Sequence, residues 1–336
     1  MHVLVTGSAG FIGRQVVQAA RDAGHEVRGL DLVAASPQER GDVRVRADAE
    51  RAVAGADALI HLAARVGLEQ DFGDSPEYIG HNGTGTAEVL SAAARAGVST
   101  VVTASSMVVY GEGLASCIEH GLVRPGLRTP AALAAGSFEP PCPLCGRPLS
   151  PHRVTEDAPL DPRNVYAASK LLQEHLAASW ARNRQGRAVH LRFHNVYGPG
   201  APRDNPYSGV ASIFLSAVLA GRAPQVTEDG GQRRDFVHVR DVARACVAAL
   251  QAPVGAGQSR AYNIASGTPR TVGEMAAQLA AAAASPAPII TGAARLGDVR
   301  HITASAERAR QELDWAASED FAAGVRELVT VERRAG

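Results

Sequence analysis

The chain has 336 residues, of which 34 are basic and 34 are acidic, so its formal net charge is zero with histidine neutral. This balance argues against an electrostatic grip on nucleic acid or on an anionic membrane. No uninterrupted apolar run reaches the ~18 residues that a transmembrane helix needs. The chain opens on an apolar strand pattern without a secretion signal. We therefore expect a cytoplasmic globular protein with neither a membrane nor a nucleic acid as its partner.

Short apolar runs alternate with helical stretches along most of the chain. Such alternation predicts an α/β fold built on a Rossmann-type, doubly wound parallel sheet with helices on both faces. The expected strands lie at 3–5, 26–30, 58–62, 101–104 and 189–194, and the expected helices lie at 11–23, 85–96, 166–182, 242–250 and 275–284.

A glycine-rich turn joins the first expected strand to the first expected helix. Gly7 permits the tight turn, Gly10 lets the backbone approach a pyrophosphate, and Gly13 permits close packing of helix on strand. Asp31 ends the second strand, where its carboxylate can accept hydrogen bonds from both ribose hydroxyls and would repel a 2′-phosphate, which favours NAD over NADP. Asp48, expected after a third strand, could reach the adenine amino group. The alternative is a ligand-free turn with a solvated aspartate.

A tyrosine, a lysine and a serine form the expected catalytic set. Lys170 follows Tyr166 by four residues, so a helix places both side chains on one face. A nearby ammonium favours the phenolate and would lower the pKa of Tyr166, which could then take a proton from an alcohol. Ser106 follows a buried strand, at the edge where parallel sheets bind ligands, and could hydrogen-bond the reacting oxygen. The alternatives are a surface helix pair and a turn serine.

Together these residues resemble the motifs of the extended short-chain dehydrogenase/reductase family, in its nucleotide-sugar epimerase/dehydratase branch. The resemblance covers the chain except for residues 113–154. It includes these further segments: His61–Ala64, Asn82–Thr86, Arg192–Pro199, Arg234–Asp241, Tyr262–Gly267 and Gly297–His301. It implies that NAD binds to Gly7, Gly10, Phe11, Ile12, Gly13, Asp31, Asp48, Leu62, Ala63, Ala64, Asn82, Tyr166 and Lys170.

The resemblance also implies that a nucleotide-diphosphate sugar is the substrate. Asn195, Arg234 and Arg295 would contact its diphosphate, with Arg300 nearby, and Ser106 would contact the sugar. An amide donor and guanidinium forks suit phosphate oxygens, although each arginine could instead form a surface salt bridge. Relatives are usually dimers through a four-helix interface, so a homodimer is expected.

The length and the order of the motifs predict two domains. Residues 1–197 would form the NAD-binding Rossmann domain, which carries an inserted segment at 113–154 and has helix 236–252 packed on it. Residues 198–336 would mainly form a smaller, nucleotide-sugar-binding domain.

The two residues after Ser106 discriminate between reactions of this family. The 4,6-dehydratases carry Asp-Glu there and glucuronate decarboxylases usually carry Glu at the second position, whereas this chain has Met107 and Val108, which cannot exchange protons. The resemblance therefore implies an isomerase, an NAD-dependent 4-epimerase that forms a transient 4-keto sugar and returns the hydride to its opposite face. The alternatives are a 4-ketoreductase, another dehydrogenase or decarboxylase of the family, and a non-catalytic NAD-sensing regulator.

The segment 113–154 carries two pairs of metal-ligand residues and no clear periodicity. Cys117 and His120 form one pair, and Cys142 and Cys145 form the other, in a Cys-Pro-Leu-Cys-Gly sequence typical of a zinc knuckle. The four would bind one structural zinc ion with a closed tetrahedral shell. His152 is an alternative fourth ligand, and free thiols or a redox pair of the two knuckle cysteines are alternatives to zinc.

The insert leaves the chain just after the serine motif and returns before Tyr166, so we expect it over the mouth of the active site. Similar cysteine-bearing inserts occur in bacterial epimerases that act on dTDP-6-deoxy sugars, notably those resembling dTDP-L-rhamnose 4-epimerases. The resemblance thus favours a dTDP- or UDP-linked hexose or deoxyhexose as the substrate.

Overall fold

The central sheet has six strands, all parallel, in the order β2-β1-β3-β4-β8-β13. The structure, a computed structural model, describes residues 1–67, 72–202 and 209–335. The strands of this sheet are β1 (His2–Thr6), β2 (Glu26–Leu30), β3 (Ala58–His61), β4 (Thr100–Ser106), β8 (Arg187–Phe193) and β13 (Gln258–Ile264). The predicted parallel α/β sheet is confirmed, and its five expected strands occur with bounds shifted by at most two residues at either end.

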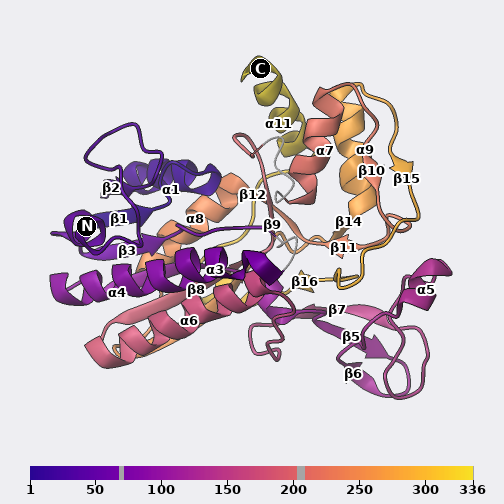
Figure 1. Cartoon of the computed structure of the whole chain (residues 1–336), viewed down its shortest axis with the longest axis horizontal. Coiled ribbons are helices and arrows are strands. Elements are labelled where there is room, and N and C mark those ends of the chain that lie inside the picture. The colour runs from indigo at the N-terminus through magenta and orange to yellow at the C-terminus, as the bar shows by residue number, and fades with distance from the viewer. Residues whose placement is uncertain (68–71, 203–208, 336) are drawn as a thin grey trace.

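Helices cover both faces of the sheet (Figure 1). Side chains alternate along β1, so that Val3 and Val5 enter one apolar core with Val242, whereas Leu4 enters the other core with Val89. Burial on both faces explains the continuous apolar runs of β1 and β3. The first core includes α1 (Phe11–Asp22) and α8 (Val239–Ala248), and the second includes α2 (Arg46–Val53), α4 (Gly85–Ala96) and α6 (Val165–Arg184).

The strand order reverses at β1, which has β2 on one side and β3 on the other. Ligands of open α/β sheets bind at such a switch point, outside the carboxyl ends of the strands. The glycine-rich turn, residues 62–64 and Ser106 all lie at this edge because each follows or ends one of these strands.

Asp48 is expected to follow a strand, but no strand lies between β2 and Asp48. Residues 41–45 form no strand, because the Asp42 carboxylate accepts the backbone N–H of Arg44 at 2.9 Å and turns the chain. Asp48 lies instead in the first turn of α2. Its carboxylate accepts the backbone N–H of Asp42 at 2.9 Å and pairs with Arg51 at 2.5 Å, so it caps this local turn.

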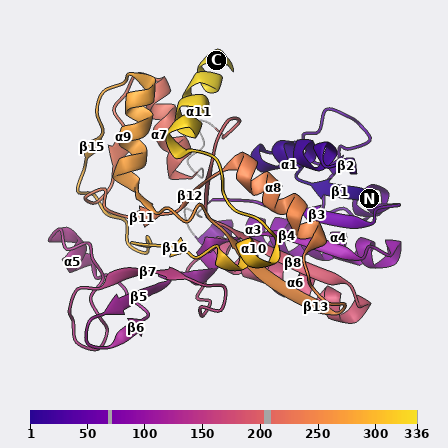
Figure 2. The same ribbon diagram turned by 180° about the vertical axis from the view of Figure 1, so that it is seen from behind.

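A second group of helices forms what we call the C-terminal lobe (Figure 2). Its core joins Phe214, Leu279 and Leu328 from three helices. The lobe comprises α7 (Val210–Leu219), α9 (Val272–Ala283), α11 (Phe321–Ala335) and two short sheets, β10 (Gln225–Val226) with β15 (Ile289–Ile290) and β11 (Arg233–Arg234) with β14 (Arg270–Thr271). Two parallel strands, β9 (Asn195–Tyr197) and β12 (Phe236–His238), connect it to the main sheet.

The insert, residues 113–154, is a small folded unit that lies beside the C-terminal lobe in Figure 1. Its lack of periodicity made regular structure unexpected, yet it contains three strands and a short helix. Its strands pair with β16 of the later chain in the order β16-β7-β5-β6. The elements are β5 (Leu114–Cys117), β6 (Gly121–Val123), α5 (Pro130–Ala134), β7 (Ser150–Val154) and β16 (Thr303–Ala304).

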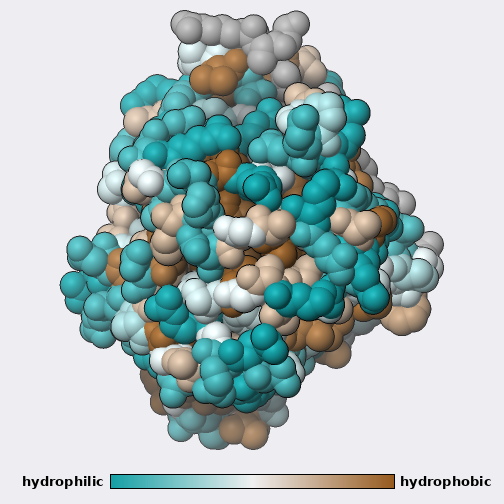
Figure 3. Space-filling model, turned by 90° about the vertical axis from the view of Figure 1, so that its left-hand side faces the viewer, coloured by the Kyte–Doolittle hydropathy of each residue, from teal (hydrophilic) through white to brown (hydrophobic). Residues whose placement is uncertain are grey.

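Short helical segments complete the fold. They are Phe72–Asp74, α3 (Ser75–Tyr78), a π-helical turn Ile79–Thr84, Met107–Tyr110, Ala249–Gln251 and α10 (Glu307–Glu312). Among the residues described, no helix combines the length and apolar character needed to cross a membrane. Figure 3 shows one side of the molecule as largely hydrophilic, with small apolar patches between polar ones.

Candidate active site

The turn after β1 is shaped so that only glycine fits at two positions. Gly7 has a φ of +71°, and a Cβ there would lie 2.8 Å from the backbone nitrogen of Ala63; a Cβ on Gly13 would lie 1.9 Å from the carbonyl oxygen of Gly7. Helix α1 begins after Gly10 without a side-chain cap and without an acidic residue in its first turn. The first N–H groups of helix α1 are therefore available to an anion, as a bound pyrophosphate requires.

Asp31 lies beside this turn, as predicted. Its two carboxylate oxygens accept the backbone N–H groups of Ala9 and Val33, each at 3.0 Å, which fixes the carboxylate at the end of β2. Phe11 and Ile12, in the first turn of α1, pack against the C-terminal core and the main core respectively. The predicted ribose-binding carboxylate and the glycine turn therefore lie side by side at the carboxyl ends of β1 and β2.

Residues after β3 lie on the other side of the same turn. Leu62, Ala63 and Ala64 are half-buried, and the N–H of Ala63 donates to the Thr6 hydroxyl at 3.2 Å. Asn82 is buried in the π-helical turn, where its amide exchanges hydrogen bonds with the backbone of Arg65 at 2.8 and 3.0 Å. Asn82 therefore holds the segment after β3 against the rest of the predicted cofactor edge.

Tyr166 and Ser106 meet at the carboxyl ends of β4 and β8. Ser106 ends β4, and its side chain lies next to that of Tyr166, which is in the first turn of α6. Burial raises the pKa of Tyr166 to about 12, while the Ser106 hydroxyl acts in the opposite direction. The pair can hold one sugar oxygen between a proton acceptor and a hydroxyl.

The expectation that Lys170 lowers the pKa of Tyr166 is not met in this structure. The Lys170 ammonium donates to the carbonyl of Ala104 and to Gln173, both at 2.9 Å, rather than to the tyrosine. The lysine is buried, and burial lowers its own pKa to about 7. The helical spacing did place both side chains on one face, but burial dominates both pKa values.

A buried chain of hydrogen bonds extends from Lys170 back to the glycine turn, and sequence analysis missed it. Gln173 donates to the hydroxyl of Thr86 at 2.8 Å, the Thr86 hydroxyl is 2.9 Å from Nε2 of His61, and Nδ1 of His61 is 2.7 Å from the Thr6 hydroxyl. Burial lowers the pKa of His61 to about 3, so the ring is neutral. The available signal was Gln173, three residues after the lysine on the same helix.

Arg234 and Asn195 lie at the junction of the main sheet and the C-terminal lobe. Arg234 donates from Nη1 to the carbonyls of Arg233 (2.8 Å) and Arg300 (2.9 Å) and from Nη2 to that of Val299 (2.6 Å). Within the described chain this leaves its Nε hydrogen and one Nη2 hydrogen without a protein acceptor. The amide oxygen of Asn195 is buried and likewise has no partner there. Arg234 therefore keeps donors that could reach an anionic ligand, whereas the unused group of Asn195 is an acceptor.

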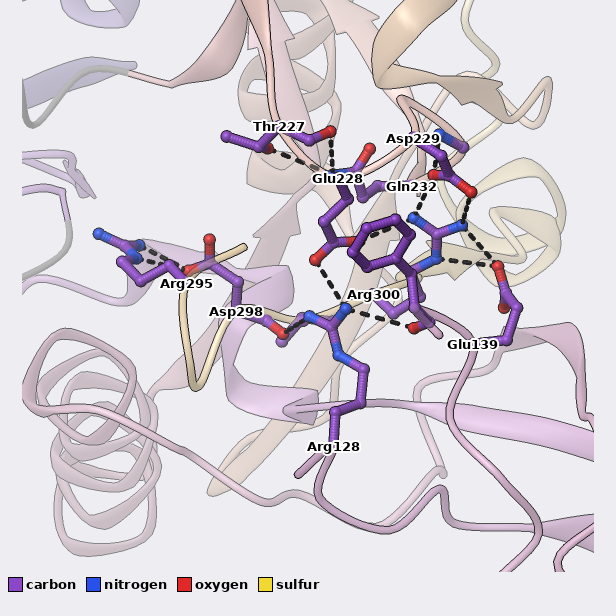
Figure 4. Close-up of polar contacts among 12 residues, drawn as sticks. Arg128, Glu139, Thr227, Glu228, Asp229, Gln232, Arg295, Asp298 and Arg300 are labelled. Atoms are coloured by element: carbon purple, nitrogen blue, oxygen red, sulfur yellow. Dashed lines mark hydrogen bonds and ion pairs between the residues drawn. The ribbon is translucent and has the colours of Figure 1, made fainter. Parts of the chain in front are cut away.

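The other two predicted diphosphate ligands are occupied by protein carboxylates. Arg295 lies on the surface and pairs with Asp298 at 2.6 Å. Arg300 is 2% exposed, and its five N–H groups are used by Glu139, Glu228 and Asp229 at 2.6–3.0 Å (Figure 4). The expectation of a diphosphate contact for Arg300 is therefore corrected, because no donor remains for a phosphate oxygen.

His194 is a second residue that sequence analysis did not single out. It lies between Phe193, which pairs in register with Ser106, and Asn195. Its ring is buried and neither ring nitrogen has a partner among the described residues. Burial lowers its pKa to about 4, so the ring is neutral. A polar ring at the end of an apolar strand was the signal available in the sequence.

The two residues that follow Ser106 form a helical turn with Val109 and Tyr110. Met107 and Val108 are half-buried and apolar, and Met107 packs against a core cluster. The backbone N–H of Val108 lies 3.4 Å from the Ser106 hydroxyl, so this turn orients the serine. Neither residue offers a proton-transfer group next to the Ser106–Tyr166 pair.

The insert brings its cysteines and histidine together. Nδ1 of His120 lies 3.5 Å from Sγ of Cys117 and 3.7 Å from Sγ of Cys142, and Sγ of Cys145 lies 3.7 Å from that of Cys117. All four ligand atoms lie within 4.8 Å of one another. Nitrogen at about 2.0 Å and sulfur at about 2.3 Å from one zinc ion would stand roughly 3.5–3.8 Å apart on tetrahedral edges. The four atoms fit that shell.

The alternatives for the insert fare differently. His152, on β7, is not among the clustered residues. Cys142 and Cys145 are not joined by a disulfide in this structure. Backbone N–H groups of Leu144 and Cys145 point to the Cys142 sulfur, as in a turn that presents thiolates to a metal. Cys246 is fully buried in the main core, away from this cluster.

The parallel sheet, the glycine turn and the Ser106–Tyr166 pair define a Rossmann-type enzyme of the short-chain dehydrogenase/reductase class. Residues 3–126 and 134–265 match the NAD dependent epimerase/dehydratase family. A dTDP-L-rhamnose 4-epimerase of Burkholderia thailandensis is 33% identical over 98% of this chain and 94% of the relative. A UDP-glucose 4-epimerase of Mycolicibacterium smegmatis is 31% identical over 98% and 97%.

Solved structures agree with these sequence relatives. MoeE5 in complex with UDP-glucose and NAD has a TM-score of 0.79 and 29% identity, covering 100% of this chain and 99% of the other. UDP-glucose 4-epimerase of Thermus thermophilus in complex with NAD has a TM-score of 0.78 and 28% identity, covering 100% of both chains. The chain belongs to the NAD dependent epimerase/dehydratase family.

Proposed function

We propose that this protein is an NAD-dependent 4-epimerase of a nucleotide-diphosphate sugar, a dTDP- or UDP-linked hexose or deoxyhexose. The observation that carries the proposal is the Ser106–Tyr166 pair followed by the apolar Met107 and Val108. This arrangement supports oxidation and reduction at one carbon and lacks groups for elimination. The 4-epimerases among the relatives support the same reaction class.

The residues at the switch point fit NAD. Any Cβ at Gly7 or Gly13 would clash with the chain's own backbone, so the turn keeps the tight shape that a pyrophosphate needs; the N-terminus of α1 is uncapped, and Asp31 is held beside this turn. We assign NAD to this edge, with Leu62, Ala63, Ala64, Asn82 and Lys170 as further contacts. The resemblance places Asp48 at the adenine, and this part of the proposal has the least structural support because its carboxylate already has two partners. NAD supplies the hydride acceptor and donor for the sugar carbon.

The chain's own groups handle the proton. Tyr166, in its phenolate form, takes the proton from the 4-hydroxyl of the sugar and returns it after the 4-keto sugar has turned over, and the Ser106 hydroxyl holds the same oxygen in both states. Lys170, with a pKa of about 7, can hold a proton at Nζ near neutral pH and is connected to Gln173. Arg234 anchors the diphosphate while the sugar rotates, since it keeps unused N–H donors, and the resemblance assigns the amide donor of Asn195 to the same diphosphate.

The test is incubation of the purified protein with a panel of nucleotide sugars, dTDP-L-rhamnose and UDP-glucose among them, with NMR of the products. The proposal expects a C4 epimer without net reduction of NAD. Stoichiometric consumption of NADH with a 4-keto sugar would instead identify a ketoreductase, and a 4-keto-6-deoxy product would identify a dehydratase.

We also propose that Cys117, His120, Cys142 and Cys145 bind one structural zinc ion. Their spacing along tetrahedral edges supports it, and four protein ligands leave no open position for catalysis. Metal analysis of protein purified without chelator should give one zinc per chain, and the Cys142→Ser/Cys145→Ser variant should lose it. The matched control is His152→Ala, which lies outside the cluster and should keep the metal. Wild-type protein without zinc would refute this assignment.

The division of labour proposed for the chain assigns NAD to residues 1–197 and the nucleotide sugar mainly to residues 198–336. Helix α8 and strand β13 lie after residue 198 but pack with the first domain. The chain therefore passes between the two domains more than once, and the proposed boundary divides them by function. We further propose a homodimer through a four-helix interface, as the resemblance implies. Light scattering at micromolar concentration should give twice the 34.9 kDa chain mass, and a monomer would exclude it.

A further inference from the structure

We propose that the insert positions Arg234, the guanidinium offered to the substrate diphosphate, through a buried ion-pair network that ends on the backbone holding that arginine. This inference rests on the proposed function of Arg234 as a diphosphate ligand. It assigns the insert a role in substrate affinity that differs from covering the active-site mouth.

The network begins on the insert at Arg128, whose side chain is 4% exposed. Its guanidinium donates from Nη1 to Glu228 of the C-terminal lobe at 2.6 Å and from Nη2 to the carbonyl oxygen of Asp298 at 2.5 Å (Figure 4). Glu228 is 3% exposed, so its charge is balanced by the neighbouring arginines and is scarcely hydrated. One insert residue thus contacts both the lobe and the loop that precedes Arg300.

Glu139 is the second insert residue in the network. Its carboxylate accepts Nε and Nη2 of Arg300 at 2.9 and 2.6 Å, and its other oxygen lies 2.7 Å from Nε2 of His301. On the lobe side, Arg300 pairs with Glu228 at 2.7 Å and Asp229 at 2.8 Å. A planar guanidinium with all five N–H groups bonded has one orientation, so the backbone at residue 300 is fixed from two directions.

That backbone is what holds Arg234. The carbonyl oxygens of Val299 and Arg300 accept Nη2 and Nη1 of Arg234 at 2.6 and 2.9 Å. Glu112, just before the insert, accepts the backbone N–H of Arg300 at 3.3 Å, which joins the same backbone to the turn that follows Ser106. The direction of the unused Arg234 hydrogens therefore depends on the position of residues 299–300.

The charges of the network explain why loss of one insert carboxylate should be felt at Arg234. Removal of Glu139 leaves Arg300 bonded only to Glu228 and Asp229, both on the lobe, so the guanidinium is drawn to one side. Removing Glu228 would be a harsher change, because it would leave the buried guanidinium of Arg128 without its carboxylate partner. Glu139 is 43% exposed, so Glu139→Gln removes its charge without burying an unpaired group.

The experiment measures the dissociation constant of sugar-free dTDP and UDP by calorimetry on NAD-loaded protein, together with KM and kcat for the epimerised sugar. We expect Glu139→Gln to raise the dissociation constant and KM by about three- to tenfold, as for a partly exposed ion pair, with kcat within about twofold of wild type. The matched control is Glu119→Gln, whose carboxylate pairs with Arg147 within the insert at 2.9 Å and touches no part of the lobe. The control should leave both constants unchanged.

A double variant tests whether the effect passes through Arg234. Arg234→Met should itself weaken dTDP and UDP binding, and adding Glu139→Gln to it should weaken binding no further. Unchanged affinity in Glu139→Gln, or the full loss persisting on the Arg234→Met background, overturns the proposal. Circular dichroism and thermal melting of each variant identify unfolding, and Arg128→Lys, which keeps the charge but cannot reach both acceptors, then serves as the second probe and should also raise the dissociation constant.

The outcomes separate this inference from the proposed function. Wild-type protein that binds dTDP or UDP but inverts no sugar would refute the 4-epimerase and leave the binding comparison decisive for the insert. Wild-type protein that binds neither nucleotide would refute both, because Arg234 would then hold no diphosphate.

Discussion

A single phenolic hydroxyl carries the proton transfer in this account. Tyr166 lies next to Ser106 and 6.1 Å, ring to ring, from a second tyrosine, Tyr78. Tyr166→Phe removes only the acid–base oxygen, so turnover should fall ~10²–10⁴-fold while folding and NAD binding persist. Steady-state kinetics and the NAD content of the purified variant measure this. Tyr78→Phe, which loses a bond to the Gly67 carbonyl instead, is the matched control and should stay within a few-fold of wild type; equal losses in both would contradict the role.

Lys170 gives the active site a pH-dependent stability cost. Burial lowers its pKa from 10.5 to about 7, so between these pH values the unfolded chain binds a proton that the folded chain lacks, and stability rises with pH. Lys170→Met removes this titration. The wild type gains stability over this range and the variant does not. The unfolding free energy of the variant minus that of the wild type should therefore become more negative as pH rises from 7 to 9.5, by at most about 1.4 kcal/mol per pH unit. Urea unfolding at both pH values measures it, and a constant difference would be inconsistent with a depressed lysine pKa.

Several site residues could be predicted at this scale and others could not. Gly7, Asp31, Ser106 and Tyr166 lie within or next to their strands and helices, so local spacing placed them together. The partners of Arg300 are distant in sequence, and Glu139 is 161 positions away, so no pattern along the chain could show that its donors are occupied. The relative strength of burial and charge at Lys170 likewise depends on packing rather than on spacing.

The turn between β1 and α1 is the element on which cofactor binding depends. A Cβ at Gly13 would lie 1.9 Å from a backbone oxygen that cannot move away cheaply, whereas one at Gly10 would lie 3.2 Å from its nearest neighbour. Gly13→Ala should therefore lower the NAD content of the purified protein at least about tenfold and cost roughly 1–3 kcal/mol of stability by overpacking. Gly10→Ala should lower stability less. NAD content, nucleotide titration and thermal melting measure the pair, and full NAD occupancy in Gly13→Ala would contradict this packing.

The elements differ in how far the sequence specifies them. Strands β1, β3, β4 and β8 are buried on both faces and each contains a short apolar run, and the period of α4 is regular, so their positions followed from pattern alone. Strands β5–β7 of the insert are half-exposed and short, and the cluster of Cys117 and Cys142 rather than a large apolar core joins them, so their hydropathy carries no period. The strand expected before Asp48 does not form, because a local turn at Asp42 replaces the extended backbone there.

At the scale of the whole molecule, three buried histidines predict sensitivity to acid. Burial lowers the pKa of His61 to about 3 and those of His190 and His194 to about 4, from 6.5. As pH falls from 6.5 to 4 the unfolded chain takes up these protons first, so stability falls, by at most about 1.4 kcal/mol per unit for each ring. Burial opposes ionisation of Glu174, but its hydrogen bonds with Arg192 and Ser105 and the nearby positive charge together outweigh burial and lower the pKa of this carboxyl, so its contribution is lost as the pH falls below 4.5.

Urea unfolding at pH 6.5, 5.5 and 4.5 measures this slope, and His194→Leu provides the comparison. The variant removes one buried ring whose two nitrogens have no protein partner in the described chain, so its stability should fall less steeply over the same range. Parallel slopes for variant and wild type would show that His194 does not remain neutral in the folded protein.

The central claim is that one sugar carbon is oxidised and then reduced from its other face within a single active site. The most direct test is a nucleotide sugar carrying deuterium at C4, incubated with the purified protein in ordinary water and followed by NMR. The account predicts a product inverted at C4 that retains the deuterium at that carbon, because Tyr166 and Ser106 exchange only the hydroxyl proton. A product that has lost the deuterium to water, or a 4-keto sugar that accumulates in proportion to reduced cofactor, would contradict it.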